Sequence, residues 1–134
     1  NNVGNPLKFT FREEFTFSGN NNVKTYSMFA EATAFNCPIY HWKNTGSIVS
    51  AFTMFQGASK FNQEIRTWDV TSLFSPNNTN SSPTAFMFSR ATAFQDKYIS
   101  LDSPPFDFWR QFKGDTEVIN GITYTYLANP AYYE

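Results

Sequence analysis

The hydrophobic and polar positions of the chain repeat with a long fixed period. The stretch YSMFAEATAFNCPIYHW, which begins at Tyr26, is followed 26 residues later by FTMFQGASKFNQEIRTW, which begins at Phe52. Equal residues fall at equal offsets in the two stretches, and a fixed period of this size is typical of stacked repeat architectures. The pattern therefore predicts a repeat solenoid in which each period forms one coil.

A third copy, AFMFSRATAFQDKYI, begins at Ala85 and follows the second after 33 residues rather than 26. The seven extra residues lie in the segment 72–84, SLFSPNNTNSSPT, which has no hydrophobic period and is rich in Ser, Asn and Pro. Such composition is typical of a loop. We expect residues 22–101 to form three repeats with an inserted loop at 72–84, preceded by a degenerate half-coil at 1–21 that acts as an N-terminal cap.

Side chains of one type recur at the same point of successive copies. Each coil has an apolar side that it cannot bury alone, so equal side chains are expected to stack from coil to coil into a continuous core. The expected structural ladder consists of Met28, Met54 and Met87; Phe29, Phe55 and Phe88; Ala32, Ala58 and Ala91; Phe35, Phe61 and Phe94; Asn36 and Asn62; and Trp42 and Trp68.

The local pattern predicts two kinds of element in each coil. Met, Phe and Ala at i, i+1 and i+4 share one face of a helix, so the start of each copy predicts a short helical turn. The segments 35–39 and 61–65 are rich in strand formers and too short for a helix, so we expect a short strand there. The predicted fold class is therefore an α/β repeat solenoid with coils of about 26 residues, each a short strand plus a short helical turn, stacked at the strand separation of about 4.8 Å.

The period ends after Leu101, and residues 102–134 are expected to close the array as a C-terminal cap and hairpin. The aromatic cluster of this cap is expected to cover the open end of the last coil. Asn120-Gly121 stands between two strand-like runs, which predicts a β-hairpin. The aromatic cluster of the C-terminal cap consists of Phe106, Phe108, Trp109 and Phe112. The whole chain, 1–134, is then a single solenoid domain.

Composition narrows the classes of partner. Aromatic residues make up 19% of the 134 residues and charged residues only 16%, with a formal net charge of −1. A nucleic-acid interface needs a basic surface, so we expect no nucleic-acid partner. No apolar run approaches the roughly 18 residues of a spanning helix, so we expect no transmembrane segment.

The sequence offers no recognisable catalytic, cofactor-binding or metal-binding set. The single histidine, His41, has no carboxylate or nucleophile at a spacing typical of a catalytic set. Glu13 and Glu14 are adjacent in the sequence, so in a strand they would point to opposite faces. No metal-ligand spacing and no nucleotide-binding loop is present. The one cysteine, Cys37, is expected to be a small, partly buried side chain, with an intermolecular disulfide as the alternative. We therefore expect no enzyme and no cofactor.

Two segments, MFAEATAFNCPIYHW and MFQGASKFNQEIRTWDV, carry a resemblance to a known family. They resemble the repeat of about 25 residues found in BspA-like surface proteins, a domain of unknown function common in mycoplasma surface lipoproteins. The stretch FNQEIRTWDV, residues 61–70, is the most specific part. Cys37 stands where the family has Gln, Lys43 where it has Asp, and Gln95 where it has Asn. The resemblance implies an irregular leucine-rich-repeat-like solenoid displayed outside the cell or particle, often linked to adhesion or host contact, and it provides no known catalytic residues to transfer to this chain.

Two function classes follow from this reading. In the first, the protein is extracellular or attached to a cell surface, and its exposed face binds a protein or glycan on a host or neighbouring surface. In the second, the protein is a structural subunit of a virion, filament or coat, and surplus aromatic residues such as Trp109, Tyr132 and Tyr133 pack against like subunits. The inserted loop also contains two N-glycosylation patterns, at Asn77 and Asn80, which predict an exposed loop.

Overall fold

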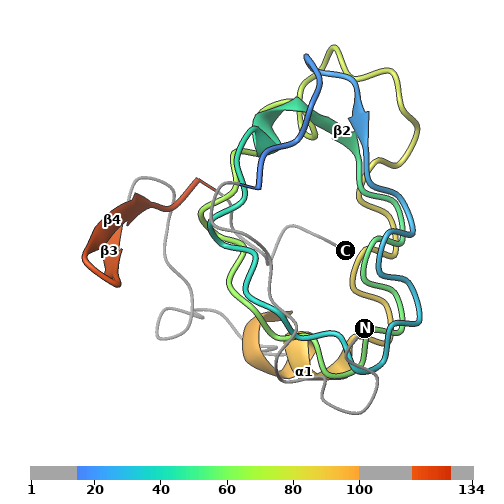
Figure 1. Cartoon of the computed structure of the whole chain (residues 1–134). Coiled ribbons are helices and arrows are strands. Elements are labelled where there is room, and N and C mark those ends of the chain that lie inside the picture. The colour runs from blue at the N-terminus through green and yellow to red at the C-terminus, as the bar shows by residue number, and fades with distance from the viewer. Residues whose placement is uncertain (1–14, 100–115, 128–134) are drawn as a thin grey trace.

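The computed structural model describes residues 15–99 and 116–127 (Figure 1). Most of the predicted half-coil at 1–21 and the predicted aromatic cluster from Phe106 to Phe112 lie outside the described residues, as do Tyr132 and Tyr133. The elements in chain order are β1 (Val23–Lys24), η2 (Thr45–Ser47), β2 (Ile48–Ser50), α1 (Thr92–Phe94), the π-helix η3 (Gln95–Ile99), β3 (Thr116–Ile119) and β4 (Ile122–Thr125).

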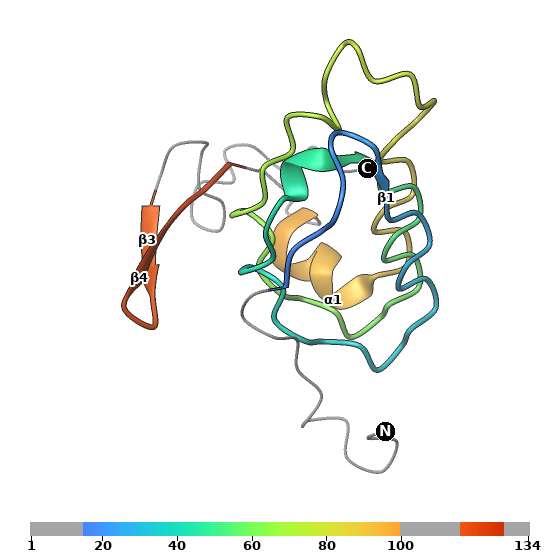
Figure 2. The same cartoon turned by 45° about the horizontal axis from the view of Figure 1, so that its top comes forward.

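Three windings of the chain lie one on another, and Figure 2 shows them side by side on the edge that carries β1. There the segments 25–31, 51–57 and 83–89 run in the same direction. Alternate N–H groups of one winding donate to carbonyls of the next, as in Phe29 to Met54 at 2.8 Å and Phe55 to Met87 at 2.9 Å. Immediately before the first two of these segments, β1 pairs with β2 in parallel, with Val23 opposite Ile48. Backbone hydrogen bonds thus join each winding to its neighbour.

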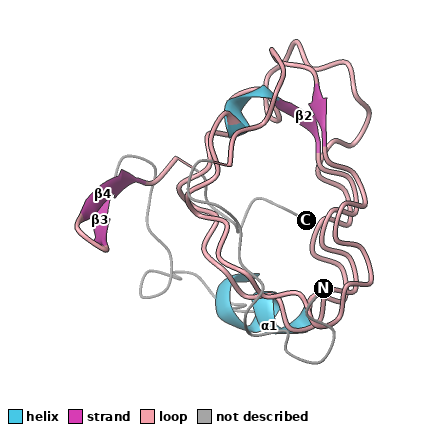
Figure 3. Cartoon of the chain, viewed as in Figure 1, coloured by secondary structure: helices cyan, strands magenta, loops and turns pink. Residues whose placement is uncertain are grey.

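The segments 25–31 and 51–57 are chains of tight turns, where the sequence predicts helical turns. The N–H groups that do not reach the next winding close local turns, as in Met28 to the Thr25 carbonyl at 3.1 Å. This alternation needs a left-handed residue at every fourth position, and Ser27 and Glu31 have φ of 57° and 60°. A helix has no such residues. The structure therefore corrects the predicted helical turns, and Figure 3 shows this edge as loop.

The short strands predicted at 35–39 and 61–65 are also absent from the described residues. Here side chains, not a backbone ladder, join the two windings. The Asn36 Oδ1 accepts the Asn62 N–H at 2.9 Å, and the Gln63 amide donates to both the Oδ1 and the carbonyl of Asn36 at 2.9 Å. The amides satisfy backbone groups that a strand would otherwise pair, so the chain turns without forming a sheet.

Aromatic rings fill the space enclosed by the windings. Phe55 stacks between Phe29 and Phe88, at 5.6 and 5.5 Å between ring centroids. Phe61 stacks in the same way between Phe35 and Phe94, at 5.6 Å on both sides. The two columns face each other at 4.2 Å between Phe55 and Phe61. Stacked ring pairs of this kind stabilise a core beyond the area that they bury.

A second set of stacked rings lies beside these columns, where the Trp42 ring is 6.1 Å from the Phe29 ring between centroids. The rings of Trp42 and Trp68 stack at 5.7 Å, and the Trp68 indole N–H donates to the Ile39 carbonyl at 2.9 Å. Phe15 stacks on the other side of Trp42 at 4.5 Å. The N–H of Lys43 donates to the Phe15 carbonyl at 2.9 Å, which holds this incoming segment against the first described winding.

β3 and β4 form an antiparallel hairpin that projects from the windings (Figure 1). Its turn residues, Asn120 and Gly121, have φ of 52° and 81°, the left-handed values that a two-residue hairpin turn requires. The hairpin is anchored by Tyr126, whose ring lies 4.4 Å from the Arg66 guanidinium carbon and whose hydroxyl donates to the Glu117 carboxylate. The Leu127 N–H also donates to the Arg66 carbonyl at 2.7 Å.

Candidate interaction surface

The structure places most of the predicted ladder in the core. The apolar members from the second and third windings, together with Phe35 and Trp42, are buried. Asn36 is exposed and Asn62 is half-buried. The Asn36 Oδ1 accepts the Asn62 N–H of the next winding, and the Asn62 carbonyl accepts a hydrogen bond from the Lys97 ammonium group. These residues therefore hold the windings together and offer no site for a ligand.

The first winding differs, because no earlier winding covers it among the described residues. Met28 is 44% exposed, whereas Met54 and Met87 are fully buried, so the predicted burial of the whole Met column is wrong for Met28. Phe29 and Ala32 are half-buried. Burial is not uniform within the first winding, since Phe35 and Trp42 are buried while Met28 is exposed.

Three aromatic side chains stand outward on the edge where the windings run parallel. They are Tyr26, Phe52 and Phe86, with 57%, 40% and 58% of their surfaces exposed. We call these three residues the aromatic strip. The rings of Phe52 and Phe86 meet edge to face at 6.4 Å. Exposed apolar groups that lie together on a surface mark interaction sites more often than scattered ones do.

The backbone ladder sets the spacing of the aromatic strip. The Ser27 N–H donates to the Phe52 carbonyl at 2.8 Å, and the Thr53 N–H donates to the Ala85 carbonyl at 3.0 Å. The hydroxyls of Ser27 and Thr53 lie 2.7 Å apart and add a side-chain bond between the same windings. The strip is therefore carried on a rigidly connected edge with one aromatic ring per winding.

The aromatic strip was not predicted from the sequence. Tyr26 and Phe52 stand 26 residues apart, so their shared position was available as a signal. Phe86 is displaced by one residue from that position, which hides it from a comparison at the fixed period. Only the structure shows that these rings point away from the core while Phe29 and Phe55, three residues further along, point into it.

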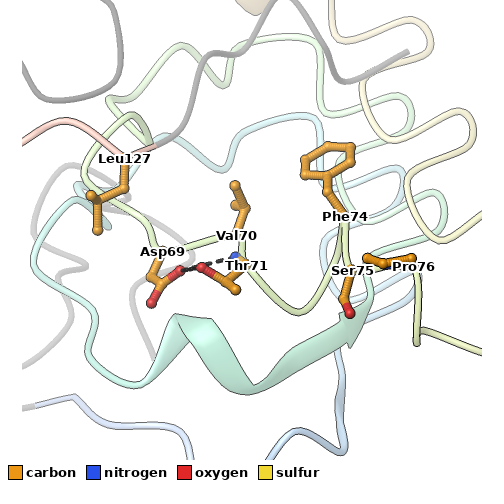
Figure 4. A pocket seen from close by; sticks show the side chains of 7 residues that line it. All are labelled: Asp69, Val70, Thr71, Phe74, Ser75, Pro76 and Leu127. Carbon is orange, nitrogen blue, oxygen red and sulfur yellow. Dashed lines mark hydrogen bonds between the residues drawn. The ribbon is translucent and has the colours of Figure 1, made fainter.

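A groove of about 410 Å³ lies between the segment 69–76 and Leu127, beside η2 and β2 (Figure 4). Phe74, which is 47% exposed, stands on one side, and Leu127 lies on the other. The volume is within the range of about 300–1,000 Å³ typical of small-ligand pockets.

Of the described residues that line this groove, Asp69 is the only charged one. Its Oδ1 accepts the backbone N–H of Thr71 at 2.9 Å and also the Thr71 hydroxyl. The Asp69 N–H donates to the Thr45 hydroxyl at 2.9 Å. No cationic side chain of the described residues pairs with the Asp69 carboxylate. The Asp-x-Thr spacing in the sequence is a signal for this local turn.

Three other titratable side chains of the described residues have identifiable surroundings. Arg90 bonds to the Glu31 carboxylate and holds the pKa of Glu31 below its ordinary value. Burial raises the pKa of the Cys37 thiol, which disfavours the reactive thiolate. His41 is half-buried and lies edge to face with the Tyr40 ring at 5.2 Å. Within residues 15–99 and 116–127 no three His, Cys, Asp or Glu side chains gather as metal ligands would.

The inserted loop carries the two predicted glycosylation positions. Asn77 is exposed, while Asn80 is half-buried and its amide donates to the Asn78 Oδ1 at 3.0 Å. The Asn78 amide in turn donates to the Val49 carbonyl at 2.9 Å, and Leu73 is buried in the core. The loop is thus tied to the windings by these contacts, and its exposed acceptor is Asn77.

Comparison with known proteins gives one match. A family model described as a Mycoplasma protein of unknown function, DUF285, matches residues 10–101, which include all three windings. No curated protein and no solved structure matches the chain. None of the helices described in the structure has the length and apolar character needed to cross a membrane.

Proposed function

The chain belongs to the DUF285 family of Mycoplasma proteins of unknown function, and from that premise we propose that it is a non-catalytic repeat domain displayed at a surface, where it binds a protein or a glycan. Its architecture in this proposal is an irregular leucine-rich-repeat-like solenoid of the kind found in BspA-like surface proteins. The parallel hydrogen bonds between windings and the two columns of stacked Phe rings support a solenoid.

The observation that carries the proposed binding function is the aromatic strip. Tyr26, Phe52 and Phe86 expose large apolar surfaces at one edge, although the same chain buries most of its other aromatic rings among residues 15–99. Exposed aromatic rings cost solubility and contribute strongly to binding energy when a partner covers them. The extracellular location rests on the family and is part of the proposal.

Binding to cell surfaces tests this proposal. The purified chain, labelled with a fluorophore, is added to fixed host epithelial cells, and bound fluorescence is compared with that of the triple variant Tyr26→Ser, Phe52→Ser, Phe86→Ser. We expect binding by the parent and a loss of at least tenfold in the variant. Pretreating the cells with protease or with glycosidases shows whether the partner is protein or glycan.

A matched control removes exposed apolar surface elsewhere. Val118 and Ile122 on the hairpin are 64% and 55% exposed, and the variant Val118→Ser, Ile122→Ser should bind as the parent does. Equal binding by the parent and the strip variant would contradict the assignment of the strip. Parent chain that binds no cell surface under any condition would contradict the adhesion function.

The alternative function, self-assembly as a structural subunit, is supported by the same apolar strip, since like subunits can cover it as well as a foreign partner can. Analytical ultracentrifugation separates the two functions. A binding module sediments as a monomer at micromolar concentration, whereas a structural subunit forms larger species that the strip variant does not form.

A further inference from the structure

The groove between the segment 69–76 and Leu127 is a second candidate site, separate from the aromatic strip. We propose that it binds an extended peptide segment in which a lysine or arginine side chain stands beside an apolar one. The cationic group pairs with Asp69, and the apolar side chain packs between Phe74 and Leu127.

Charge complementarity identifies the cationic part of the ligand. Asp69 carries the only charge among the described residues that line the groove, and no Lys, Arg or His of residues 15–99 and 116–127 pairs with it. Its two recorded side-chain bonds both end on Oδ1, whereas a carboxylate offers about four acceptor positions. The carboxylate therefore retains acceptor capacity for a charged donor.

The carboxylate is also held in place before any ligand arrives. The Thr71 N–H and hydroxyl fix its Oδ1, while the Asp69 N–H donates to Thr45 on η2. Side-chain ordering is one of the costs of binding, and a group that is already ordered avoids much of that cost. Asp69 is thus oriented by its own turn.

The apolar walls select against a ligand that is only charged or only polar. Phe74 and Leu127 stand on opposite sides of the groove, with Val70 between them (Figure 4). A neutral saccharide would leave Asp69 without a cationic partner, and a free polyamine would leave the walls without apolar contact. A basic and apolar peptide satisfies both features, and an exposed aromatic ring also attracts a nearby cation.

The groove is built from segments far apart in the sequence, so it exists only in the folded chain. Leu127 is held at the groove by its N–H bond to the Arg66 carbonyl at 2.7 Å. Phe74 follows Leu73, whose side chain is buried in the core. Both walls are therefore fixed by contacts outside the groove.

The test uses the full chain and two acetylated, amidated peptides. One is Ala-Leu-Lys-Leu-Ala, and the other has norleucine in place of lysine, which keeps the apolar stem and removes the charge. Titrations followed by the backbone amide signals of Thr71 and Leu127 give both dissociation constants at low ionic strength. We expect the lysine peptide to bind about threefold to tenfold more tightly than the norleucine peptide. This preference should fall as salt is added, because screening weakens an exposed ion pair.

Three variants assign the preference to its residues. Asp69→Asn retains an oxygen that can accept the Thr71 N–H but loses the charge, so it should bind the two peptides equally. Phe74→Ser should weaken both peptides while retaining the preference for lysine. Asp96→Asn removes an exposed carboxylate on η3, away from the groove, and should behave as the parent does.

Three outcomes would overturn the proposal. They are equal affinities of the parent for the two peptides, an unchanged lysine preference in Asp69→Asn, and signal changes that fall outside the segment 69–76 and Leu127. Shifts of the Thr71 and Leu127 signals by a neutral maltohexaose probe, with none from the lysine peptide, would also overturn it. These results are independent of the cell-binding test, because that test changes residues of the aromatic strip and the hairpin and none of the residues that line the groove.

Discussion

Glu31 and Arg90 stand 59 residues apart in the chain and form an ion pair across two windings. The residue between them in the middle winding is Gly57, and a Cβ built on it would lie 2.4 Å from the Glu31 Oε1. All three residues have positive φ, at 60°, 75° and 60° for Glu31, Gly57 and Arg90. Because Gly57 has no side chain, the side chains of Glu31 and Arg90 can reach each other across the middle winding.

This ion pair predicts a specific dependence of stability on pH. The hydrogen bond from Arg90 lowers the pKa of Glu31 from its ordinary value of 4.5, so the pair stabilises the folded state fully above that value. The stabilisation is lost as the pH falls through the lowered pKa. We expect Glu31→Gln to melt slightly below the parent at pH 7 and level with it in strong acid. Thermal melting of both chains from pH 7 to pH 2 measures this, and a difference that grows in acid would contradict it.

Gly57→Ala should destabilise the protein by about 1–2 kcal/mol, because an L side chain in the left-handed region is strained by about that amount. The new methyl group also displaces the Glu31 carboxylate from its place beside Arg90. Urea unfolding gives the free energy. Gly121→Ala, at φ of 81° with nothing within 4 Å of the added Cβ, is a control with the same backbone strain and no displaced ion pair.

Phe61→Ala should destabilise the fold by about 3–5 kcal/mol, as large-to-small substitutions of buried aromatic residues do. Phe61 is fully buried and stacks on Phe35, Phe55 and Phe94. Phe86→Ala, at an exposed ring, should stay within about 0.5 kcal/mol of the parent. Chemical denaturation of both variants measures this, and a Phe61→Ala chain as stable as the parent would mean that the ring columns do not support the windings.

Cys37 should react slowly with Ellman's reagent at pH 7 in the folded protein and rapidly after unfolding in urea. The thiol is 5% exposed, and burial raises its pKa, so little thiolate is present or accessible. The same burial disfavours the intermolecular disulfide that the sequence left as an alternative. Rapid labelling of the folded chain, or a disulfide-linked dimer on a non-reducing gel of folded protein, would contradict this expectation.

Asn77 should be the preferred glycan acceptor when the chain is secreted from a glycosylating eukaryotic host. It is exposed, whereas the Asn80 amide is engaged by Asn78. Intact-mass analysis should show one glycan on the parent and on Asn80→Gln, and none on Asn77→Gln. A parent chain with only the polypeptide mass would remove this prediction.

Much of the internal packing can be traced to the sequence. Equal Phe residues 26 apart lie in contact in successive windings, as Phe29 with Phe55 and Phe35 with Phe61. The reason is that a repeated apolar position can be covered only by its counterpart in the next winding. The Asn120-Gly121 turn also depends on local chemistry alone, because these residues tolerate the positive φ of a tight hairpin.

The tertiary structure decided what the period leaves open. Local composition favoured helical turns and strands, but the bonds between windings take every second N–H of the segments 25–31 and 51–57, and the remaining groups close turns. The period also treats Met28 and Met54 alike, although only Met54 has a described winding on both sides. The aromatic strip and the groove arise where Phe86 departs from the period and where Leu127 meets Asp69, so both sites depend on long-range contacts that no local pattern records.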